Sequence, residues 1–137
     1  MAAGETRRQA ARQTLRVAVE AVYIDPVIRR WVIQLVRATR AAEGVAIGAS
    51  VRGSLALERA ARGWALLHDR AYVTPVDVEH LFLPVLGHRV VFTPKTLADA
   101  RRTGWDVALA EFRASTLAAI PPPSSVFESD HEEPADR

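Results

Sequence analysis

The sequence contains no cysteine and only one lysine, and no hydrophobic run in it is long enough to cross a membrane. Without cysteine there is neither a disulfide framework nor a thiolate metal site. The first residues, MAAGETRRQAAR, also lack the apolar segment of a secretory signal peptide. These absences lead us to expect a soluble, cytoplasmic protein.

The sequence also lacks the parts of an ATP-hydrolysing site. A P-loop needs glycines whose backbone amides wrap the phosphates, followed by lysine and then serine or threonine. The single lysine, Lys95, precedes Thr96 but follows Thr93-Pro94, so the pair is a chance dipeptide. No hydrophobic strand ends in paired acids that would hold magnesium. The chain alone is therefore not expected to bind and hydrolyse ATP.

The composition indicates one helical domain with an acidic end. A chain of 137 residues fits a single domain, and its abundant alanine, leucine and arginine favour helix. Residues 1–120 carry 17 Lys/Arg against 11 Asp/Glu, whereas residues 121–137 carry one against five. We expect the structured domain to cover 1–120 and the Pro/Ser-containing, acidic tail 121–137 to be disordered.

Local start signals predict most of the helices. Asp25-Pro26 and Thr74-Pro75 each place a capping side chain before a proline at the first helical position, and Asp77 makes the second pair close to a capping box. The expected helices are Glu5 to Ile24, Pro26 to Ala42, one that Ser50 caps and that ends near Asp69, Pro75 to Gly87, Pro94 to Gly104, and Trp105 to Ala118.

These helices predict an all-α bundle of five to six helices, with room for one very short two-stranded β ribbon. We expect that ribbon to pair Tyr72–Thr74 with Arg89–Phe92, and we expect residues 44–48 to form a loop. A stripe at helical spacing and the three tryptophans are expected in the core. These are Leu57, Ala60, Ala61, Trp64 and Leu67 for the stripe, and Trp31, Trp64 and Trp105 for the tryptophans.

One arginine has an unusual position. Ser50 is a good N-cap, and Arg52 follows it in the first helical turn, where the helix dipole disfavours a cation by roughly a few tenths of a kcal/mol. A guanidinium beside free N–H groups makes sense if a phosphate is expected there. The alternative is a surface arginine paired with Glu43 or Glu58.

At these residues the sequence resembles the C-terminal lid domain of MoxR-type AAA+ ATPases. The resemblance rests on GASVR from Gly48 to Arg52, on DRAYVTPVDVEHL and on PVLGHRV, and it extends from Arg16 to Phe92, with weaker likeness to Pro123. It implies that Arg52 is the phosphate-sensing arginine, with Ser50 and Gly48 shaping the helix start. Valine replaces the usual proline before this arginine.

The resemblance also implies a function that this chain carries only in part. It implies a lid that caps the ATP site and couples hydrolysis to chaperone-like remodelling of protein partners. ATP and its magnesium are then bound through a nucleotide-binding domain of the same or a companion chain. This fragment alone is expected to bind neither. The resemblance further implies neighbouring subunits of a hexameric ring, an unidentified client protein and no membrane. No catalytic residue is expected in this chain.

Two other functions stay open from the residues alone. The arginine excess suits a basic helical module that binds nucleic acid, although the arginines are dispersed and no recognition motif is present. A helical protein-interaction domain is the other alternative.

The remaining polar residues carry no metal-binding pattern. The histidines lack ligand spacing, and the acidic run at 130–133 is expected to be solvated. Asp69-Arg70 is expected to form a local ion pair or cap, and His88-Arg89 a structural or interface feature. The histidines concerned are His68, His80 and His88.

Overall fold

The computed structural model describes residues 2–124, and within them it contains six helices and one short antiparallel ribbon. The prediction of an all-α bundle with a tiny ribbon is confirmed. The predictions for residues 125–137, including the one for the acidic run, lie outside the described residues. The elements are α1 (Ala2–Ala21), α2 (Pro26–Ala38), β1 (Val45–Ile47), α3 (Val51–Leu67), α4 (Pro75–Leu86), β2 (Val91–Phe92), α5 (Pro94–Thr103) and α6 (Trp105–Ala119).

The predicted cap-and-proline starts are confirmed. The Asp25 side chain accepts a hydrogen bond of 2.7 Å from the N–H of Val27 at the start of α2. At α4, Thr74 and Asp77 form a capping box, with the N–H of Thr74 donating to Asp77 Oδ2 at 2.8 Å. The hydroxyl of Thr93 accepts from the N–H of Thr96 and starts α5. These helices begin where they do because each side chain satisfies a backbone group that the first turn leaves free.

The ribbon pairs different segments from those predicted. Val45–Ile47 pairs with Val91–Phe92, so the expected loop contains a strand, and Tyr72 instead forms a parallel bridge with Tyr23. Gly44 provides the turn into β1, with φ of 78° and a carbonyl that accepts from the N–H of Thr93 at 2.9 Å. This anchor places β1, rather than the 72–74 segment, beside β2.

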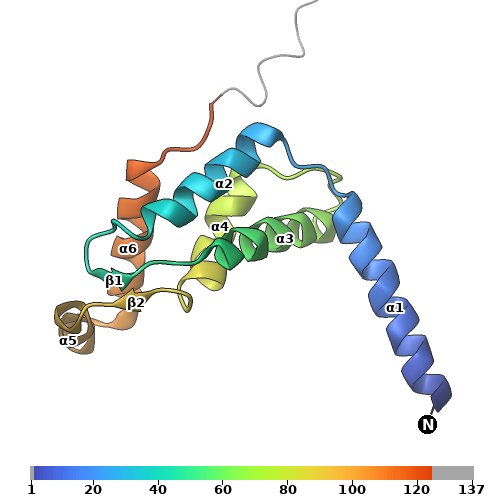
Figure 1. The fold of residues 1–137 in the computed structure, drawn as a ribbon, viewed down its shortest axis with the longest axis horizontal. Helices are drawn as coiled ribbons and strands as arrows, with labels where there is room; N and C mark the ends of the chain where they lie inside the picture. Colours follow the sequence, from blue (N-terminus) through green and yellow to red (C-terminus); the bar gives the residue numbers. More distant parts are fainter. Residues whose placement is uncertain (1, 125–137) are drawn as a thin grey trace, which may run out of the picture.

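The hydrophobic core lies where α2, α3 and α4 pack together, with α6 closing one side (Figure 1). Phe112 of α6 links two parts of this core, because its ring lies 5.4 Å from that of Phe82 and 5.5 Å from that of Phe92. The Trp31 indole N–H donates to the carbonyl of Ile120 at 3.0 Å, which fastens the end of α6 to α2.

Two residues predicted in the core lie at the surface. Leu67 is 79% exposed, because α3 ends there and turns away. The turn is a Schellman motif in which Asp69 has φ of 55° and the N–H of Arg70 donates to the carbonyl of Ala65 at 2.9 Å. Trp105 is 45% exposed at the start of α6, whereas Trp31 is buried and Trp64 is half-buried.

Helix α1 differs from the others because none of its residues is buried. Figure 1 shows it leading away from the body of the domain, with its later part close to α3. Arg62 of α3 holds this junction, donating to the carbonyl of Glu20 at 3.0 Å and to Glu58 at 2.8 Å. Within residues 2–124, no helix is both long enough and apolar enough to span a membrane.

Candidate functional site

The loop that leads into α3 is fixed by a close contact between backbones. A Cβ atom at Gly48 would lie only 2.6 Å from the backbone nitrogen and Cα of Arg40, so the position requires glycine. Next to it, the N–H of the buried Ala49 donates to the hydroxyl of Thr39 at 2.9 Å. Because Thr39 ends α2 and is fully buried, the start of α3 has a set position relative to α2.

Ser50 occupies the N-cap of α3, as predicted, but its hydroxyl makes no capping hydrogen bond. The first turn is closed by backbone instead, with the N–H of Gly53 donating to the carbonyl of Ser50 at 2.8 Å. No acidic residue lies in this first turn. The helix start therefore keeps N–H groups that no side chain in residues 2–124 caps, together with the positive end of the helix dipole.

Arg52 is the second residue of α3 and is exposed. It forms no ion pair with any residue in 2–124, so the pairings with Glu43 or Glu58 that the sequence left open are not formed. Glu58 instead bridges Arg62 and Arg29, at 2.8 and 3.2 Å. Within the described part of the chain, Arg52 is therefore an exposed cation at the helix start without an acidic partner.

A second arginine lies at the same helix start, which the sequence pattern did not predict. Gly53 is buried in the first turn, where an added Cβ would lie 3.2 Å from Leu86 and 3.8 Å from Cδ of Arg89. The stem of Arg89 therefore lies beside the first turn of α3. The sequence indicated only that His88-Arg89 is a structural or interface feature, because its place depends on how α4 packs against α3.

Arg70 and Asp77 form the ion pair that fixes the connection between α3 and α4. The two side chains are joined by two hydrogen bonds of 2.7 and 2.5 Å, and Asp77 is only 3% exposed. Burial raises the pKa of Asp77, but the hydrogen bonds from Arg70 and Thr74 outweigh it and hold that pKa below its usual range. The bond to Asp77 raises the pKa of Arg70. Of the ion pair or cap expected at Asp69-Arg70, the structure shows the cap, in the turn that ends α3, while the ion pair of Arg70 is with Asp77.

Two of the histidines pack against an aromatic ring. The Trp64 ring lies 4.4 Å from that of His68 and 4.5 Å from that of His80. Within residues 2–124, no group of three or more histidine or acidic side chains is placed to hold a metal ion. His68 and His80 therefore contribute packing against Trp64 at the surface.

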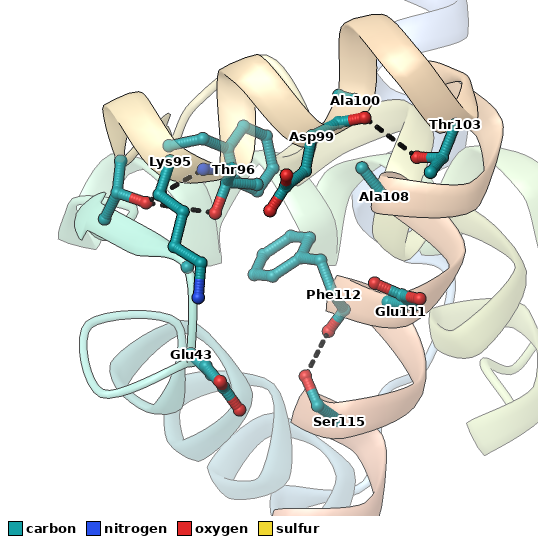
Figure 2. A pocket seen from close by; sticks show the side chains of 13 residues that line it. Glu43, Lys95, Thr96, Asp99, Ala100, Thr103, Ala108, Glu111, Phe112 and Ser115 are labelled. Carbon is teal, nitrogen blue, oxygen red and sulfur yellow. Dashed lines mark hydrogen bonds between the residues drawn. The ribbon is translucent and has the colours of Figure 1, made fainter.

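A hollow of about 450 Å³ lies beside β2, α5 and α6. Figure 2 shows Lys95 extending into it on the side of Glu43, while Phe112 lies within it. Thr96 belongs to the start of α5, where its hydroxyl lies 3.0 Å from that of Thr93. The Lys95-Thr96 pair thus begins a helix after a threonine cap and has no glycine-rich loop before it.

Comparison with known proteins places the chain in a family. The AAA lid domain family matches residues 37–106. The chaperone MoxR1 of Mycobacterium tuberculosis is 44% identical over 78 residues, covering 50% of this chain and 21% of that protein. The protein MoxR of Paracoccus denitrificans is 34% identical over 116 residues, covering 75% and 33%.

Two further comparisons agree with this family assignment. The protein YeaC of Bacillus subtilis, whose function is unassigned, is 40% identical over 81 residues, covering 59% of this chain and 25% of that protein. A crystal structure of a candidate ATPase from Cytophaga hutchinsonii superposes with a TM-score of 0.58 at 27% identity, covering 70% of this chain and 32% of that one. The chain spans a third or less of the length of these relatives. It belongs to the AAA lid domain family, as the lid of a MoxR-type AAA+ ATPase.

Proposed function

We propose that this lid caps the ATP site of its ATPase and that Arg52 contacts the phosphates of the bound nucleotide. The observation that carries the proposal is an exposed arginine at the start of a helix, where the described residues 2–124 provide neither an ion pair for it nor a side-chain cap for the helix. Phosphate fits such a position because both the guanidinium and the free N–H groups donate to anionic oxygens.

The nucleotide-binding domain supplies the rest of the site in this proposal. It would contribute the P-loop and the magnesium, since the described residues of the lid assemble neither. The lid contributes position: Gly48 sets the loop against α2, and Ser50 begins the helix that carries Arg52. A phosphate at Arg52 would therefore hold the lid in one orientation relative to the nucleotide.

Chaperone-like remodelling is the process that this orientation would serve. The MoxR1 relative is described as a chaperone, which supports remodelling of a client protein by the whole assembly. In that assembly the partners are the nucleotide-binding domain and the neighbouring subunits of a hexameric ring. Movement at Arg52 reaches the body of the lid because α3 packs on both α2 and α4.

Replacing Arg52 in the assembled ATPase tests the proposal. With the nucleotide-binding domain present, Arg52→Ala is expected to lower ATP turnover at least about tenfold, equivalent to about 1.4 kcal/mol of lost transition-state stabilisation. Arg52→Lys should restore only part of it, because an ammonium keeps the charge and loses the planar fork. The lid alone should change in unfolding free energy by no more than about 0.5 kcal/mol, as at other surface sites.

Arg30→Ala is the matched control, because Arg30 is also an exposed helical arginine without an ion pair in residues 2–124. Arg62 is unsuitable as a control, since it holds α1 to α3. Full turnover after Arg52→Ala would show that the residue is idle, and unfolding of the lid would show that it is structural.

A further inference from the structure

A hollow of about 530 Å³ lies between the later part of α1 and the middle of α3. The two helices meet at the Arg62 junction and diverge from there, as Figure 1 shows. We refer to this site as the α1–α3 hollow. Its lining consists of Arg12, Leu15, Arg16, Val19 and Glu20 of α1 and Arg59 of α3.

The charges around the α1–α3 hollow are mostly positive and uncompensated. Arg12, Arg16 and Arg59 form no ion pair with any residue in 2–124. Glu20 is the one acid in the lining, and its backbone carbonyl already accepts from Arg62. Three guanidiniums against one carboxylate leave a concave surface that attracts carboxylates.

Two of the residues that line the hollow are apolar. Leu15 is 62% exposed, and Val19 lies half-buried one helical turn further on. A large aliphatic side chain in water is ordinary by itself. Here Leu15 lines the same hollow as three arginines, and apolar side chains together with arginines are typical of protein interfaces.

We propose that the α1–α3 hollow docks an acidic segment of a protein partner that carries an apolar side chain. The apolar side chain would pack on Leu15 and Val19, while the carboxylates would pair with Arg12, Arg16 and Arg59 in bidentate fashion. Protein fits better than nucleic acid, because the apolar lining residues and the carboxylate of Glu20 offer no favourable contact to a phosphate backbone. The surface is independent of the proposed role of Arg52, which lies about two turns away at the start of α3.

A labelled amphipathic peptide, with glutamates on both sides of a leucine stripe, is the probe for this surface. Fluorescence anisotropy with the full 137-residue chain should give a Kd of about 0.1 mM or tighter, rising with salt. The triple variant Arg12→Ala/Arg16→Ala/Arg59→Ala should weaken binding at least about tenfold. Leu15→Ser should weaken it at least about threefold, with the helix content unchanged by circular dichroism.

The control removes the same charge elsewhere. Arg30→Ala/Arg37→Ala/Arg101→Ala removes three exposed arginines of α2 and α5 that also lack ion pairs in residues 2–124. It should change peptide affinity less than about twofold if the hollow, rather than net charge, binds the peptide. Equal losses in both triple variants would overturn the proposal.

The other occupants give different results. Duplex DNA that binds more tightly than the peptide, and loses affinity with the hollow triple variant, would assign the surface to nucleic acid. If the peptide binds only after residues 125–137 are deleted, the acidic end of the same chain is the occupant. No binding of the peptide to either form would also refute the docking of an acidic protein segment.

Discussion

At the residue scale, the ion pair between Arg70 and Asp77 is the polar contact on which stability should depend most. Asp77 is nearly fully buried and also completes the capping box with Thr74. Asp77→Asn should therefore lower the free energy of unfolding at pH 7 by about 2 to 3 kcal/mol, because it leaves Arg70 without its charged partner. Asp99→Asn, in the exposed pair with Arg102, should cost no more than about 0.5 kcal/mol.

The pH dependence of that difference follows from the direction of the pKa shift. The pKa of Asp77 is lower in the folded chain than in the unfolded one. The pair therefore contributes fully above the ordinary aspartate pKa, about 3.9, and its contribution is lost as the pH falls through the folded value. Urea unfolding of wild type and Asp77→Asn should converge in acid. A difference that persists undiminished at low pH would show that the carboxylate charge is not its cause.

At the element scale, α1 should be the least stable helix of the domain. None of its residues is buried, and an isolated helix of this kind is marginal in water. In hydrogen–deuterium exchange, amides in the first half of α1 should exchange far faster than those of α3, whose Leu57, Ala61 and Ala65 are fully buried. Equal protection in both helices would mean that α1 is held by contacts beyond its junction with α3.

The elements also show which parts of the structure were predictable from sequence. The starts of α2, α4 and α5 were predictable, because each depends on a cap and a proline within a few residues. The pairing of the ribbon was not predictable, because Val45 and Phe92 are distant in sequence and other short apolar segments had the same β-strand pattern.

The candidate site likewise has features that the sequence could predict and features that it could not. The place of Arg52 in the first turn of α3 could be predicted from Ser50 and the helical stripe that follows. The free hydroxyl of Ser50 and the approach of Arg89 to Gly53 could not, since both depend on how the helices pack. The apolar periodicity also predicted one stripe position too many, Leu67, because periodicity does not show where a helix ends.

At the scale of the whole molecule, the lid by itself should be a poor nucleotide binder. One arginine at a helix start gives a phosphate few contacts, and the described residues contain no P-loop. Calorimetric titration of the isolated chain with ATP should therefore show affinity no better than about millimolar, without turnover above background. A micromolar affinity would mean that the chain holds a complete nucleotide site, contrary to its role as a lid.

The glycine contact that leads into α3 bears on the entropy of the phosphate binding that we propose for Arg52. Gly48 lies against the backbone of Arg40, and Ala49 is bonded to Thr39, so this stretch is ordered before any anion arrives. Ordering a free loop would cost about 1 to 2 kcal/mol for each residue, whereas an arginine side chain costs at most about 2 kcal/mol in total. A phosphate that meets Arg52 therefore has only one side chain left to immobilise, and most of its interaction energy remains available to hold the lid in place.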